Sequence, residues 1–194
     1  MNQENIYILI EDKTVSVVSQ NNPDRKVKAH FLVFTMGYSS YTFAMAFPDE
    51  KTESVIEGIN HALKYMGCLP QAFRPDNMKT AVSSNTREGI VLSTAMEDLQ
   101  NYYDVPVLPA RPLHPKDKAT VERGVLILER ELLSRLESVV HENFDDLNHQ
   151  ILLYLQDLNT RIKTGESMSR YELFEKIDKP HMRRGRISFS NSDR

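Results

Sequence analysis

The sequence predicts an α/β fold in which a mixed β-sheet is covered by helices. Short apolar, β-branched runs typical of strands come first, apolar residues spaced three and four apart follow, and strand-like and helix-like segments then alternate. The 194 residues, 40% hydrophobic and 26% charged, fit one main core better than two full domains.

Three strands are predicted at the start of the chain. Residues 6–10 form a short apolar run, and residues 14–18 continue it with the same β-branched character. A turn cluster at residues 21–24 separates this run from strands over residues 27–36 and 41–47. The last two strands are most simply a hairpin.

An amphipathic helix is predicted from Thr52, because the apolar spacing changes there from two to three and four. Its apolar stripe consists of Val55, Ile56, Ile59, Ala62, Leu63 and Met66. Gly67 is expected to end the helix, since glycine readily adopts the left-handed conformation of a helix C-terminus. The helix should cover one face of the sheet.

A short strand is predicted over residues 71–75. Pro75 cannot donate a hydrogen bond to a neighbouring strand, so it belongs at the strand's end. Asp76 therefore follows at a strand-to-loop junction. Ligand chemistry in open α/β sheets gathers beyond the carboxyl ends of strands.

The next segments continue the alternation. A polar loop through residues 83–85 should lead to a helix over residues 93–103 and a strand over residues 105–108. After a proline-rich connector, Asp117 is a plausible N-cap of a long helix. The apolar stripe predicted for that helix is Val121, Val125, Leu128, Leu132, Leu136 and Val139.

Helices over residues 144–162 and 170–177 follow. We therefore expect a core over residues 1–140, a helical extension over residues 141–180, and a polar, basic tail over residues 181–194 that is mobile. The order of elements suits a ribonuclease-H-like fold: a mixed five-stranded sheet flanked by helices, with a C-terminal helical extension.

Composition excludes several classes of protein. The single cysteine, Cys68, rules out an intramolecular disulfide and is expected to have a packing role. The six histidines show no metal-ligand spacing, and no apolar run approaches the roughly 18 residues of a membrane span. A cytoplasmic protein is expected, and the net charge of -3 neither indicates nor forbids nucleic-acid binding.

Two carboxylates are candidates for metal chemistry. Asp76 leaves a strand end, and Glu122 lies on the first turns of the long predicted helix. Oxygen ligands on rigid elements suit Mg²⁺, and phosphodiester chemistry commonly uses such ions. Spacing alone also allows a simpler interpretation, in which Asp76 caps a turn and Glu122 is a solvated helix charge.

Five segments resemble, in order and spacing, the integrase core of IstA-type insertion-sequence transposases. They are residues 28–47, Lys-Thr-Glu-Ser at 51–54, Arg-Pro-Asp-Asn-Met-Lys-Thr at 74–80, Leu-Pro-Ala-Arg at 108–111 and Pro-Lys-Asp-Lys-Ala-Thr-Val-Glu at 115–122. The resemblance covers about residues 6–180. It implies a three-carboxylate Asp-Asp-Glu (DDE) site that uses Mg²⁺ or Mn²⁺ for DNA cleavage and strand transfer.

By position, Asp76 resembles the second acid of that site and Glu122 the third. The resemblance further implies DNA as substrate, a homo-oligomer, an AAA+ ATPase helper and no membrane partner. Because 194 residues leave little room for the family's separate DNA-binding modules, we expect the catalytic core alone.

The first acid is missing from the expected position. Relatives carry Tyr-x-Asp in the first strand, and matching Tyr7 to that tyrosine places Leu9 where the aspartate should stand. Glu11 lies two residues further along, roughly 6.5 to 7 Å away, so it needs a local rearrangement to substitute, and Asp12 needs a bend. Two interpretations stay open: a catalytic core, and a non-catalytic module for self-association or DNA binding.

Basic residues cluster around the third acid. Arg111, Lys116, Lys118 and Arg123 are candidates for contacts with DNA phosphates. Lys118 and Glu122 are equally consistent with an exposed helical ion pair. In the tail, residues 183–186 contain three arginines, which fit either a backbone-binding arm or a solvated linker.

Overall fold

A computed structural model of the chain describes residues 5–17, 26–75, 82–86, 89–108, 126, 128–136 and 139–185. In chain order its elements are β1 (Asn5–Val17), β2 (Lys26–Met36), β3 (Thr42–Phe47), α1 (Thr52–Met66), β4 (Ala72–Pro75), β5 (Val82–Thr86), β6 (Gly89–Leu92), α2 (Thr94–Tyr103), the π-helix η1 (Leu128–Leu133), α4 (Ser134–Leu136), β7 (Val140–His141), α5 (Phe144–Thr160), α6 (Arg170–Leu173), the π-helical turn η2 (Phe174–Asp178) and the 3-10 turn η3 (Lys179–His181).

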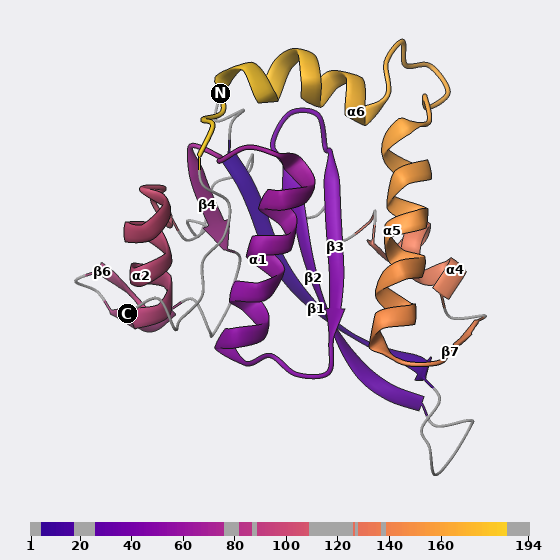
Figure 1. Cartoon of the computed structure of the whole chain (residues 1–194), viewed down its shortest axis with the longest axis horizontal. Coiled ribbons are helices and arrows are strands. Elements are labelled where there is room, and N and C mark those ends of the chain that lie inside the picture. Colours follow the sequence, from indigo (N-terminus) through magenta and orange to yellow (C-terminus); the bar gives the residue numbers. More distant parts are fainter. Residues whose placement is uncertain are drawn as a thin grey trace.

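The central sheet is mixed, as predicted, with the strand order β3-β2-β1-β4 (Figure 1). β1 pairs antiparallel with β2 and parallel with β4, while the short β7 pairs with the far end of β1. The predicted strand over residues 105–108 appears as a parallel bridge between Phe73 and Val107. It therefore lies beside β4, where a ribonuclease-H-like order requires it.

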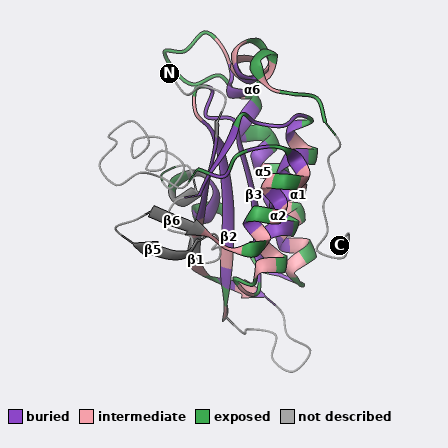
Figure 2. Ribbon diagram, turned by 90° about the vertical axis from the view of Figure 1, so that its left-hand side faces the viewer, coloured by how far each residue is buried: buried purple, intermediate pink, exposed green. Residues whose placement is uncertain are grey.

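Helix α1 covers one face of this sheet, and α2 lies on the same side (Figures 1 and 2). The Tyr103 hydroxyl donates a 2.6 Å hydrogen bond to Asn60 Oδ1, which ties α2 to α1. Gly58 faces the sheet so closely that a Cβ there would lie 2.3 Å from Leu32 Cδ2. Gly67 ends α1 in the left-handed conformation, with φ 70°, as expected.

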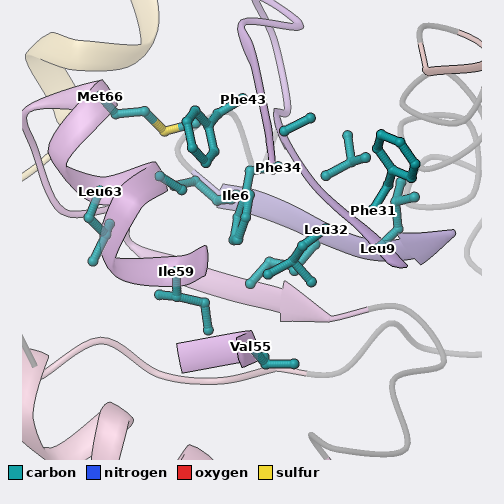
Figure 3. Packing of buried hydrophobic residues seen from close by; sticks show 14 of the residues in the cluster. Ile6, Leu9, Phe31, Leu32, Phe34, Phe43, Val55, Ile59, Leu63 and Met66 are labelled. Carbon is teal, nitrogen blue, oxygen red and sulfur yellow. The ribbon is translucent and has the colours of Figure 1, made fainter. Parts of the chain in front are cut away.

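The two faces of the sheet are both apolar. Side chains alternate along β1 and β2, so Ile6, Leu32 and Phe34 lie on the face covered by α1, whereas Leu9 and Phe31 point to the opposite face (Figure 3). Burial on both faces explains why residues 6–9 form a continuous apolar run instead of an alternating one.

The edge strand β3 is closed by two asparagines of α5. Asn159 Oδ1 accepts from the Thr42 N–H at 3.1 Å, and Asn159 Nδ2 donates to the Thr42 carbonyl at 2.7 Å. Asn148 makes the same pair of bonds to Ala46, at 2.7 and 3.0 Å. An unpaired strand edge invites association with another chain, so α5 both covers this edge and satisfies it.

Three local predictions were wrong. The segment predicted as a polar loop around residues 83–85 forms the β5–β6 hairpin, because backbone pairing does not require apolar side chains. Within the described residues, the long helix ends at Leu136, and Val139 lies outside it and is exposed. The π-helical turn η1 interrupts the repeat of 3.6 residues per turn on which the predicted apolar stripe was based. Helix α5 ends at Thr160, which leaves Ile162 56% exposed.

The C-terminal segments return to the sheet. The carboxylate of Asp178 is fully buried and accepts a 3.1 Å bond from the Ser39 N–H, and the Phe174 ring stacks on Tyr41 at 4.5 Å. The expected boundaries at residues 140 and 180, and the mobility of residues 181–194, stay predictions. Within the described ranges, no helix is both long and apolar enough to cross a membrane.

We predict that Asn159→Ala destabilises the protein by about 2–4 kcal/mol, because it leaves the N–H and carbonyl of Thr42 buried without their partners. Asn148→Ala is the matched variant; Asn148 itself is only half-buried, so its loss should cost less. Urea unfolding followed by circular dichroism measures both. If neither substitution lowers the free energy of unfolding measurably, these amides do not stabilise the pairing of α5 with the edge of β3.

Candidate active site

The candidate site lies where β1 and β4 run side by side in the same direction. Their parallel register pairs Tyr7 with Arg74 and Ile8 with Pro75, which is the last residue of β4. One residue further along each strand, the sequence has Leu9 in β1 and Asp76 after β4. The strand end predicted to precede Asp76 is therefore adjacent to the position expected for the first acid.

Leu9 is a core residue. It is 3% exposed, lies opposite Val33 of β2, and shares its face of the sheet with Phe31 (Figure 3). A hydrocarbon side chain provides no ligand for a metal, so the described part of the first strand does not fit a three-carboxylate site. Leu9 is therefore buried in the core at the position predicted for the first acid.

The strand shows no local distortion that would bring another acid to this position. Pairing with β2 continues without a register shift through Leu9–Val33, Glu11–Phe31 and Asp12–His30. A bulge or bend would be needed to move Glu11 by two residues along the strand. The side chains of Glu11 and Asp12 lie outside the part that the structure describes, so the observation concerns their backbone.

The other predicted site residues fall outside the described residues. These are Asp76, Glu122, Arg111, Lys116, Lys118 and Arg123. Their convergence stays a prediction. Among the residues that are described, no group of three or more histidine, cysteine, aspartate or glutamate side chains is placed to hold a metal ion.

Arg74 is a buried charged residue of β4 for which the sequence predicted no role. This arginine is only 7% exposed, and its pairing with Tyr7 places it on the same face as Leu9. A buried guanidinium is costly unless it interacts within the protein, and Arg74 does have such interactions. The signal was present in the sequence as a charged residue inside the short strand at 72–75.

Cys68 is not a nucleophile of this site. The thiol is buried after the end of α1 and lies 3.5 Å from the sulfur of Met182. Burial raises the pKa of the Cys68 thiol to about 11, which disfavours the reactive thiolate. This environment agrees with a packing role.

The chain is similar in sequence to several transposases. It is 35% identical over 180 residues to a putative transposase for insertion sequence IS408 of Burkholderia multivorans, and the match covers 93% of this chain and 35% of the relative. A putative transposase of Sinorhizobium fredii is 34% identical over 93% of this chain and 35% of its own length. The chain therefore spans about a third of these relatives. No family model matches the sequence.

Solved structures with a similar fold include integrase catalytic cores. The catalytic core of BIV integrase aligns with a TM-score of 0.64 at 17% identity and covers 92% of this chain and 98% of that one. The HTLV-2 integrase catalytic core in complex with magnesium aligns with a TM-score of 0.59 at 14% identity, over 88% and 95%. The fold is ribonuclease-H-like, and the similarities together support an integrase-like core related to transposases.

We predict that Cys68 reacts with a thiol reagent such as DTNB at least about a hundredfold more slowly in the native protein at pH 8 than in urea. Raising the pKa from 9.0 to about 11 reduces the thiolate fraction by that factor before burial limits access.

The raised pKa of Cys68 also makes the stability of the fold depend on pH in a defined direction. The folded state keeps the proton longer than the unfolded state, so the contribution of Cys68 to stability is complete below pH 9 and is lost as pH rises toward about 11. Cys68→Ala in the same pH series is the control. Rapid native labelling at pH 8 would contradict the described burial.

Proposed function

We propose that the chain is the integrase-fold core of a DNA transposase and takes part in DNA cleavage and strand transfer. The observation that carries this proposal is the parallel register of β1 and β4, because it ends β4 at Pro75, one residue before Asp76 in the sequence, beside the first-acid position in a fold similar to integrase cores. The sequence similarity to transposases supports DNA as the substrate.

Asp76 and Glu122 are the carboxylates proposed to hold Mg²⁺ or Mn²⁺. Both provide the oxygen ligands that these ions prefer. A bound ion would supply charge stabilisation for phosphodiester chemistry. The magnesium named for the HTLV-2 integrase core supports this choice of ion for a core of similar fold.

Arg111, Lys116, Lys118 and Arg123 are proposed to contact the DNA backbone. Contacts of this kind position DNA without distinguishing its sequence. They weaken as the salt concentration rises, because the release of DNA counterions then gains less free energy. We further propose that the protein acts in the cytoplasm as a homo-oligomer with an AAA+ ATPase helper. The dimeric and trimeric forms named for the HTLV-2 core support self-association.

A second candidate function is a non-catalytic module that keeps the fold for self-association or DNA binding. Leu9 favours this alternative, because it occupies the first-acid position and is buried among core residues. Loss of one ligand weakens a site built for a hard cation. The two functions differ in whether metal binding and strand transfer depend on Asp76.

We predict that the protein joins pre-cut duplex DNA with free 3′-hydroxyl ends to a supercoiled plasmid in the presence of Mn²⁺. Asp76→Asn and Glu122→Gln should each lower the yield at least about a hundredfold, because each removes a charged ligand without a large change of shape. Glu57→Gln, at an exposed position of α1, is the control and should retain activity. Products that do not differ between the wild type and Asp76→Asn would refute the catalytic function.

We predict that Leu9→Asp creates the missing ligand. Without metal it should lower the melting temperature, since it buries a carboxylate in the core. Mn²⁺ at a hundredfold excess over Kd should then return about 2–3 kcal/mol of stability by mass action.

Leu9→Asn is the matched variant, with similar shape and no charge, and should gain little from Mn²⁺. Combining Leu9→Asp with Asp76→Asn should abolish the gain. If Mn²⁺ stabilises Leu9→Asp and Leu9→Asn equally, the position does not belong to a metal site.

A further inference from the structure

Residues 183–185, the last that the structure describes, pack against Leu69 just before β4 and are called the strap below. Arg183 pairs antiparallel with Leu69: the Leu69 N–H donates to the Arg183 carbonyl at 2.8 Å, and the Arg183 N–H donates to the Leu69 carbonyl at 3.0 Å. Gly185 packs so closely on this segment that a Cβ there would lie 2.2 Å from Leu69 Cδ1. Two independent contacts therefore hold the strap on the residues that precede β4.

The side chain of Arg183 reaches a second segment, the end of α2. Its Nη2 donates to the Tyr103 carbonyl at 3.1 Å and to the Asp104 carbonyl, and its Nη1 donates to Asp104 Oδ2 at 3.0 Å. Asp104 ends α2 in the left-handed conformation, with φ 51°. The guanidinium thus satisfies two carbonyls at a helix C-terminus, where a cation is also favoured by the helix dipole.

The two segments joined by Arg183 continue directly into two strands that pair with each other. From Leu69 the chain enters β4, and from Asp104 it enters residues 105–108. The Phe73 N–H donates to the Pro106 carbonyl at 2.9 Å, and the Leu108 N–H donates to the Phe73 carbonyl at 2.8 Å. Among the described residues the outer strand bridges β4 at Val107 alone. It is also held by Gln100 of α2, whose side chain accepts a 2.9 Å bond from the Val107 N–H, and by the burial of Val105 and Val107. Arg183 adds to these contacts a direct connection between the start of this strand and the segment that precedes β4.

We propose that Arg183 is a positioning residue that holds residues 105–108 in register against β4. We call the three bonds from the Arg183 guanidinium the Arg183 clamp. In sequence, β4 leads to Asp76 and residues 105–108 lead toward Glu122. The clamp therefore helps to fix the relative positions of the two strands that precede the proposed acids. Its consequence for catalysis rests on the proposed function, whereas the clamp itself does not.

This role separates Arg183 from the other arginines of the tail. Its guanidinium already donates to three oxygens of Tyr103 and Asp104 at the end of α2, so contact with a DNA phosphate would compete with these bonds. Most of the binding should come from the two carbonyls, because the carboxylate of Asp104 is 91% exposed and ion pairs at such positions contribute little.

Amide hydrogen exchange tests the clamp on the whole chain, without DNA or metal. Arg183→Ala keeps the backbone bridge to Leu69 and removes only the guanidinium; we expect about five- to tenfold faster exchange at Phe73 and Leu108, with the amides of β2 unchanged. Arg183→Lys should be intermediate, since an ammonium cannot reproduce the planar fork. Asp104→Asn, which tolerates the left-handed conformation and keeps both carbonyls, should stay within about twofold of the wild type.

The proposal is overturned if Arg183→Ala leaves exchange at Phe73 and Leu108 within twofold of the wild type. It is also overturned if β2 exchanges faster by the same factor, because that would show a global loss of stability. In the strand-transfer assay, Arg183→Ala should lower kcat about five- to tenfold with KM for DNA unchanged. If the wild type transfers no strands, the proposed function fails, and the exchange experiment still decides the clamp.

Discussion

The parallel pairing of β1 with β4 is the constraint on which the rest of this structure depends. β1 is the only strand of the described sheet that contacts β2, β4 and β7, so its register fixes the positions of all three. Because both of its faces are buried, a shift by one residue would exchange the residues packed against α1 with those on the opposite face. The same register places Leu9 next to the strand end that precedes Asp76.

Leu9 is the residue through which this strand register bears on function. The residue is well suited to the core, where it packs with other apolar side chains, and unsuited to a metal site. The position predicted for the first acid therefore contributes here to packing, while the buried Arg74 lies on the same face of the neighbouring strand. The local electrostatics thus differ from those of three converging carboxylates, because a guanidinium carries positive charge.

Much of the fold could be predicted because it follows from local patterns. The apolar runs of the first strands, the stripe of α1 and the stop at Gly67 are all visible within a few residues of sequence. The β5–β6 hairpin was missed because its polar residues pair through the backbone, and the π-helix η1 was missed because periodicity arguments assume 3.6 residues per turn. The amides of Asn148 and Asn159 and the clamp of Arg183 join segments far apart in sequence, so no local pattern could indicate them. For the candidate site, the motif indicated Asp76 and the departure at Leu9, but burial of Leu9 and Arg74 required the fold.

We propose that Asp76 and Glu122 meet at the end of β4 closely enough to share a divalent ion. A crystal soaked in Mn²⁺ and measured at a wavelength with strong anomalous signal from manganese tests this convergence most directly. We expect an anomalous peak bound by a carboxylate oxygen from each residue, beside the side chain of Leu9. Absence of any peak, together with the two carboxylates pointing apart, would contradict it.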